Sequence, residues 1–195
     1  MIRSIGLIVG AFVLAGAVHA QQNVNVRGTI TAFDGKVVSI KARDGRDVRV
    51  DLPETAGVST TKAITLSDIK PGTVVGVTTV KRADGAIVAI DVRPLPPTVP
   101  LGLTPYDLQP GSTMTNARLE GAVQSAGGQE LMLNFKTGTV KVLVPPGTPM
   151  TQALPGSRSD IKPGERIYVA ARPAQDGKLT AVRVQVSKDG VNPSQ

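Results

Sequence analysis

The chain has 195 residues with a formal charge of +7 at pH 7, and only 3% of its residues are aromatic. It contains no cysteine and no tryptophan, and its one histidine, His19, lies within the first twenty residues. Without imidazole or thiolate, the rest of the chain cannot form a Ser-His-Asp or Cys-His site, an ordinary zinc or copper site, or a disulfide. We therefore expect a protein that is not an enzyme and has no cofactor.

Residues 1–20 have the layout of a secretory signal peptide. Arg3 gives a positive start, an uncharged apolar run follows from Ile5 to Val18, and Val18-His19-Ala20 has small residues at the two positions that a signal peptidase reads. The run is shorter than the roughly 20 residues that a membrane-spanning helix needs. The sequence thus predicts cleavage before Gln21 and a periplasmic protein with no transmembrane span in the mature chain.

Residues 24–93 read as one small barrel of five strands. The expected strands are 24–33, 36–42, 47–52, 73–81 and 86–93. Apolar residues alternate along them, as in Val48, Val50 and Leu52. Asp-Gly pairs at 34–35, 44–45 and 84–85 supply the positive φ that tight hairpins require. Between the third and fourth strands, Ser67 to Gly72 predicts one helical turn, capped by its serine and ended by Pro-Gly.

Residues 94–116 are expected to form an apolar strap between two barrels. The segment holds six prolines, which favour an extended chain, and it has several apolar side chains, among them Tyr106 and Met114. We expect this strap to lie across the barrels as a packing element, with Tyr106, Asp107 and Met114 as its anchor. A partner-binding groove around Tyr106 is the alternative.

Residues 117–188 repeat the first unit, and residues 189–195 remain as a tail. Ser67 to Gly72 recurs unchanged as Ser159 to Gly164, an offset of 92 residues. Upstream the offset is 93, where Gly28 matches Gly121. The expected strands are 119–125, 130–136, 140–144, 166–171 and 179–186, with a helical turn at 159–162. Three strands, a helical turn and two strands is the order of an OB-like barrel, so the predicted fold is all-β with two tandem five-stranded OB-like barrels.

The chain resembles a family of small exported bacterial proteins that carry domains of unknown function. The resemblance is most specific in Pro105-Tyr106-Asp107-Leu108 and in the run from Gly111 to Asn116. It implies a periplasmic protein of undetermined activity and supplies no catalytic or ligand residues. Members are sometimes labelled metal ABC transporter permeases, which conflicts with the absence of a spanning segment after residue 20.

The excess of Lys and Arg over Asp and Glu predicts a candidate binding site for an anionic partner. Residues 24–95 carry 11 Lys and Arg against 8 Asp and Glu, whereas residues 115–188 carry 10 against 5. If Leu133, Val142 and Val184 face inward, Lys136, Lys141 and Arg183 face outward on the second barrel. Such a face would attract an anionic envelope component or an acidic protein. The alternative is that these three residues are ordinary surface charges without a binding role.

Other partners are less well supported. Binding of single-stranded nucleic acid needs exposed aromatic side chains, and few exist here, so no nucleic-acid partner is expected. Asp44, Asp47 and Asp51 do not have the spacing of a calcium loop, and arginines interleave with them. The predicted function is therefore that of an exported envelope binding or adaptor protein. A periplasmic accessory to metal transport, using oxygen ligands only, is the second hypothesis. The sequence does not predict the oligomeric state.

Overall fold

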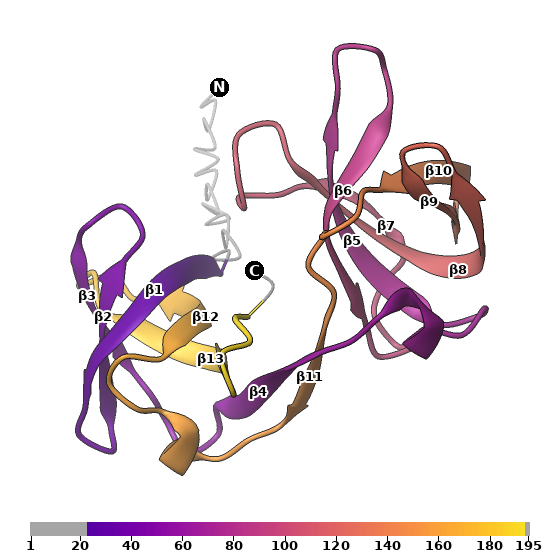
Figure 1. Cartoon of the computed structure of the whole chain (residues 1–195). Helices are drawn as coiled ribbons and strands as arrows, with labels where there is room; N and C mark the ends of the chain where they lie inside the picture. Colours follow the sequence, from indigo (N-terminus) through magenta and orange to yellow (C-terminus); the bar gives the residue numbers. More distant parts are fainter. Residues whose placement is uncertain (1–22, 194–195) are drawn as a thin grey trace, which may run out of the picture.

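The computed structural model describes residues 23–193, which form two small β-barrels (Figure 1). The expected signal peptide, residues 1–20, and the last two residues of the tail lie outside the described residues. No helix within residues 23–193 is long and apolar enough to cross a membrane.

Ten strands lie where the sequence predicts them. They are β1 (Val24–Phe33), β2 (Val37–Ala42), β3 (Asp47–Asp51), β5 (Val74–Lys81), β6 (Ile87–Pro94), β8 (Thr113–Ser125), β9 (Gly128–Phe135), β10 (Gly138–Val144), β12 (Arg166–Pro173) and β13 (Leu179–Val186). β8 begins earlier than expected, because β7 (Gly102–Pro105) pairs with its first residues. The expected Asp-Gly turns are confirmed, since Gly35, Gly45 and Gly85 have φ values of 93°, 85° and 86°.

The two copies exchange strands instead of each closing its own barrel. β1, β2 and β3 of the first copy close with β13 and β12 of the second, and we call this the terminal barrel. β8, β9 and β10 of the second copy close with β5 and β6 of the first, and we call this the central barrel. The OB-like fold class is confirmed, but the barrels do not follow the expected boundaries 24–93 and 117–188.

Two strands that the sequence analysis missed carry the chain between the barrels. β4 (Gly57–Ala63) and β11 (Thr151–Pro155) run antiparallel to each other, side by side between the barrels in Figure 1. At the repeat offset of 92, Thr61 corresponds to Ala153, and these two residues are register partners. A pseudo-two-fold axis therefore passes through this pair. The chain is a single-chain form of a strand-exchanged dimer, in which each unit donates its last two strands.

Each barrel core combines residues of both copies. In the terminal barrel, Ile30, Ile40 and Val50 pack with Val169 and Val184, and all five are at most 1% exposed. In the central barrel, the corresponding cluster joins residues of β5 and β6 to Leu119, Leu131 and Leu133. Burying each large aliphatic side chain contributes about 1.5–3 kcal/mol, so neither copy completes its core in this arrangement without the other.

The expected helical turns are present as short 3-10 helices, η1 (Leu66–Asp68) and η2 (Arg158–Asp160). Their caps are not the expected Ser67 and Ser159 but Thr65 and Ser157, two residues earlier. The carboxylate of Asp160 accepts a bond of 2.9 Å from the backbone N–H of Ser157, which with Lys188 lowers the Asp160 pKa to about 2. The serines were misassigned because each turn begins two residues earlier, where the N-cap residue and the aspartate three residues later form a capping box.

The duplicated first strands are offset by four residues from their sequence match. In the terminal barrel Gly28 pairs with Ile167, and the counterpart of Ile167 in the central barrel is Val75, which pairs with Ala117. Ala117, not Gly121, is therefore the structural counterpart of Gly28. The β8–β9 hairpin has four more residues than the β1–β2 hairpin, which explains the shift.

Candidate functional site

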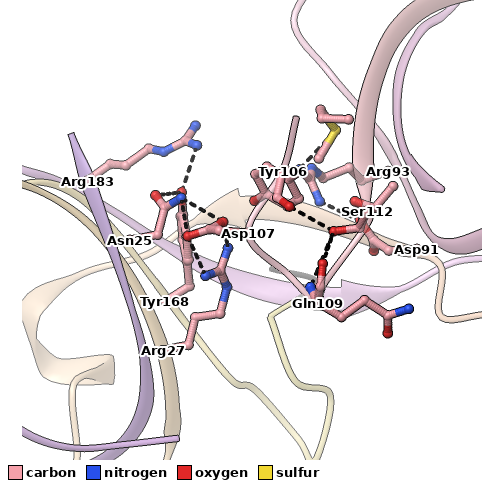
Figure 2. A network of polar contacts seen from close by, with 12 residues as sticks. Asn25, Arg27, Asp91, Arg93, Tyr106, Asp107, Gln109, Ser112, Tyr168 and Arg183 are labelled. Atoms are coloured by element: carbon pink, nitrogen blue, oxygen red, sulfur yellow. Dashed lines mark hydrogen bonds and ion pairs between the residues drawn. The ribbon is translucent and has the colours of Figure 1, made fainter. Parts of the chain in front are cut away.

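The barrels meet at a polar junction formed by the tip of the strap (Figure 2). Asp107 accepts two hydrogen bonds from Arg27 of β1, at 2.7 and 3.1 Å, and two from the Asn25 amide, at 3.0 and 3.1 Å. The Asn25 oxygen accepts a bond of 2.9 Å from the Tyr168 hydroxyl, which in turn accepts one of 3.4 Å from Arg183. The strap is thus fixed to the outer face of the terminal barrel.

The Arg27 guanidinium lies between two aromatic rings of different segments. Its Cζ atom is 5.5 Å from the ring centroid of Tyr106 in the strap and 5.4 Å from that of Tyr168 in β12. Such cation–π contacts contribute about 0.5–2 kcal/mol, more when the cation is desolvated. Arg27 therefore joins β1, β12 and the strap.

At this junction, burial and ion pairing shift the pKa values of Arg27 and Asp107 in opposite directions. The Arg27 side chain is only 9% exposed, and burial lowers its pKa, but the hydrogen bond and charge of Asp107 outweigh that effect and raise it overall. Burial likewise raises the pKa of Asp107, yet the bonds from Arg27 and Asn25 hold it below its usual value. Burial raises the pKa of Tyr106. Both charged groups are therefore ionised at neutral pH.

Met114, the third residue of the expected strap anchor, lies on β8 of the central barrel. Met114 is 6% exposed, and its sulfur lies 3.6 Å from Nη2 of Arg93. Arg93 also pairs with the buried Asp91 at 2.5 Å. Ser112 donates bonds of 2.9 and 2.8 Å to the carbonyls of Tyr106 and Gln109, which shape the strap tip. These contacts hold Tyr106 and Asp107 in position from the central barrel.

The three predicted basic residues do not form one face. All three are exposed, as expected, but Lys136 and Lys141 lie at β9 and β10 of the central barrel, whereas Arg183 lies on β13 of the terminal barrel. Arg183 also lies over the Tyr168 ring, 5.6 Å from its centroid. The strand exchange separates them, so the prediction of a single basic patch on one barrel is wrong.

A groove opens beside the junction on the terminal barrel. Its volume is about 970 Å³, and its lining includes the apolar residues Val26 and Leu179. The charged residues of the lining are Arg27, Arg43, Arg46, Arg49 and Lys178 with Asp44, Asp47, Asp107 and Asp176. Asp44 pairs with Arg46 at 2.7 Å, and Asp47 with Lys41 at 3.2 Å. Two of the three aspartates that the sequence analysis weighed as a calcium site, Asp44 and Asp47, therefore belong to ion pairs.

Sequence reasoning missed the residues that the tertiary structure gathers here. Arg27 and Arg43 lie apart in the sequence, and the available signal was the outward register of Arg27 between the buried Val26 and Gly28. Within residues 23–193, no group of three or more His, Cys, Asp or Glu side chains could hold a metal ion.

Removal of the Asp107 charge should destabilise the protein. In Asp107→Asn, the buried Arg27 loses its carboxylate partner, and we expect a loss of about 1–3 kcal/mol in the free energy of unfolding, measured by urea denaturation. The matched control is Asp84→Asn, because Asp84 pairs with Arg82 at the surface, where both side chains are 55% exposed. That change should cost under about 1 kcal/mol. Equal losses in the two variants would contradict a structural role for the Arg27–Asp107 pair.

Comparison with known proteins identifies one segment of the chain. Residues 120–185 match a family described as a domain of unknown function, DUF5666. This interval runs from within β8 to within β13, so it contains strands of both barrels. No curated protein and no solved structure matches the chain.

Proposed function

We propose that this protein is an exported, non-catalytic binding module of the cell envelope, which holds an anionic partner on the terminal barrel. Export is supported by the signal-peptide layout of residues 1–20. A binding role is supported by the absence of histidine and cysteine after residue 20 and by the groove beside the junction.

The observation that carries the proposal is the distribution of charge between the barrels. Residues 23–63 and 151–193, which include the strands of the terminal barrel, contain 14 Lys and Arg against 9 Asp and Glu. Residues 64–150, which include those of the central barrel, contain seven against six. The strand exchange thus concentrates nearly all of the surplus of Lys and Arg on the terminal barrel. The charge of each sequence copy, taken separately, does not predict this distribution. A concentrated surplus attracts an anionic partner and orients its approach.

The geometry of the groove fits this role. Its lining combines apolar residues with arginines from β1 and the β2–β3 hairpin. An anionic group of the partner pairs with these arginines while an apolar part of the same partner contacts the apolar residues. Arg46 and Arg49 are exposed and lie outside the junction, so they can be changed without removing a structural contact of the strap.

The test is capture from envelope extract by the immobilised mature chain, read by mass spectrometry at low and high salt. Exposed charges are screened beyond about 8 Å at physiological ionic strength, so capture should fall with salt. Arg46→Glu with Arg49→Glu should reduce capture at least tenfold. The control, Lys136→Glu with Lys141→Glu, makes the same change of charge on the central barrel and should retain it. Salt-independent capture that survives the groove variant would overturn the proposal and favour the apolar strap as the interface.

A further inference from the structure

The first residues of β1 have a strand on one side only. β1 pairs with β12 from its first residue, but its register with β2 begins at Gly28. The Arg27 carbonyl accepts a bond of 2.9 Å from the Arg43 N–H, so it points away from β12. The N–H and C=O of Asn25, two residues earlier, point the same way. Within residues 23–193, Asn25 has its only register partner in β12, so this edge of β1 is open.

The central barrel has a strand at the corresponding edge. Asn25 pairs with Ala170, whose counterpart at the offset of 92 is Thr78, and Thr78 pairs with Met114. Met114 is therefore the counterpart of Asn25. On its other side Met114 pairs with Thr104 of β7, which runs antiparallel to β8. Among the strands that the structure describes, none takes the place of β7 in the terminal barrel.

The groove beside the junction follows this open edge. Four consecutive residues of β1 line it, from Val24 to Arg27. The strap tip approaches β1 through Asp107, which contacts the side chains of Asn25 and Arg27 (Figure 2). In the part of the chain that the structure describes, no main-chain hydrogen bond joins the strap to Asn25. The edge that β7 covers in one barrel is thus the wall of a groove in the other.

The lining of the groove indicates which side chains an added strand would carry. A residue opposite Asn25 would have its side chain on the outer face, which Arg49 shares. Arg49 is exposed and belongs to no ion pair within residues 23–193. The next residue would point inward, toward Val24 and Val48. Acidic residues in alternation with apolar ones match this arrangement.

We propose that the terminal barrel binds an extended acidic segment of a partner protein, which adds a strand to β1 antiparallel at Asn25. The inference rests on the proposed function and names the chemical class of the partner. Main-chain bonds to an open edge supply affinity in this mode of recognition, and alternate side chains supply specificity. β7 provides the template for this strand within the same molecule.

The test is an NMR titration of the ¹⁵N-labelled, untagged mature chain with a seven-residue peptide in which aspartate and valine alternate. We expect saturable shifts at the amides of Asn25 and Arg27, and slower hydrogen exchange at Asn25 in the complex. Methylation of the peptide nitrogens at the aspartates removes the N–H groups that face β1. It should weaken the affinity at least about tenfold, as expected for the loss of backbone hydrogen bonds.

The matched control is the same peptide methylated at the valine nitrogens, whose N–H groups point away from β1. Its affinity should change by less than about threefold, because no bond to the barrel is lost. On the protein side, Asn25→Pro removes the amide donor of the open edge, a position where strands tolerate proline. Its reference is Asn25→Ala, which loses the same side chain and keeps the amide. The proline variant should bind the unmethylated peptide more weakly than the alanine variant.

Equal effects of the two methylations would overturn the inference, as would the absence of a saturable shift at Asn25. A shift at Asn25 with phosphatidylglycerol vesicles but not with the peptide would assign the groove to a lipid surface instead. The envelope capture experiment tests the charges of Arg46 and Arg49 and not the edge of β1. Capture that depends on those arginines, without peptide binding at Asn25, would therefore remove the added strand and leave the proposed function standing.

Discussion

Cysteines introduced at Thr79 and Thr113 should form a disulfide in nearly every molecule. The two residues are register partners in β5 and β8, and their hydroxyl oxygens lie 2.9 Å apart. Cross-strand partners have Cα atoms about 4.5–5.5 Å apart, within the range that a disulfide can bridge. The chain has no cysteine of its own, so no other thiol competes. The measurement is mass spectrometry of proteolytic fragments without reduction.

The same experiment distinguishes exchanged from unexchanged barrels. If each copy closed its own barrel, β8 would pair with β12, and Thr113 would lie opposite Ala171, the counterpart of Thr79 at the offset of 92. The control variant therefore has Thr113→Cys with Ala171→Cys, and it should remain reduced. A disulfide in the control but not in the Thr79 variant would show that the strands are not exchanged.

Replacing Gly28 by alanine should destabilise the protein by about 3 kcal/mol or more. A Cβ at this position would lie 2.1 Å from the carbonyl oxygen of Lys41, which is backbone and cannot rotate away. β1 and β2 would have to separate, in the same strand pair that carries Arg27 and leads to Arg43. Thermal or urea unfolding of the variant measures the loss.

Gly121→Ala is the matched control for this change. Gly121 is the sequence counterpart of Gly28, yet no atom lies within 4 Å of where its Cβ would be. Because alanine loses less backbone entropy than glycine on folding, this variant should be as stable as the wild type or slightly more stable. Equal destabilisation at both positions would contradict the four-residue shift between the copies.

The local elements and the fold class could be predicted from the sequence alone. The alternation in 47–52 and the Asp-Gly turns predicted β3 and its neighbours, because these patterns act between residues close in the chain. The outward orientation of Lys136, Lys141 and Arg183 followed in the same way from the period of a strand. Tyr106 and Met114 were selected because an apolar strap must bury its side chains, and Met114 is 6% exposed.

β4 and β11 were not predicted because they lack alternating apolar residues. Ser59, Thr60 and Thr61 give no such pattern, and they form a strand because β11 and β13 pair with it from both sides. The pairing that makes this segment a strand exists only in the folded chain, where segments distant in the sequence meet.

Which copy supplies which strand to a barrel could not be predicted from local sequence patterns. The two units are duplicates, with an identical hexapeptide before the fourth strand of each, so exchanged and unexchanged closure bury similar side chains. Local pattern cannot distinguish these arrangements. The extended path of β4 and β11 determines which arrangement forms. It thereby also determines the partners of Arg27 and the separation of Arg183 from Lys141. The candidate site is therefore a product of long-range pairing, whereas the barrels that carry it are encoded locally.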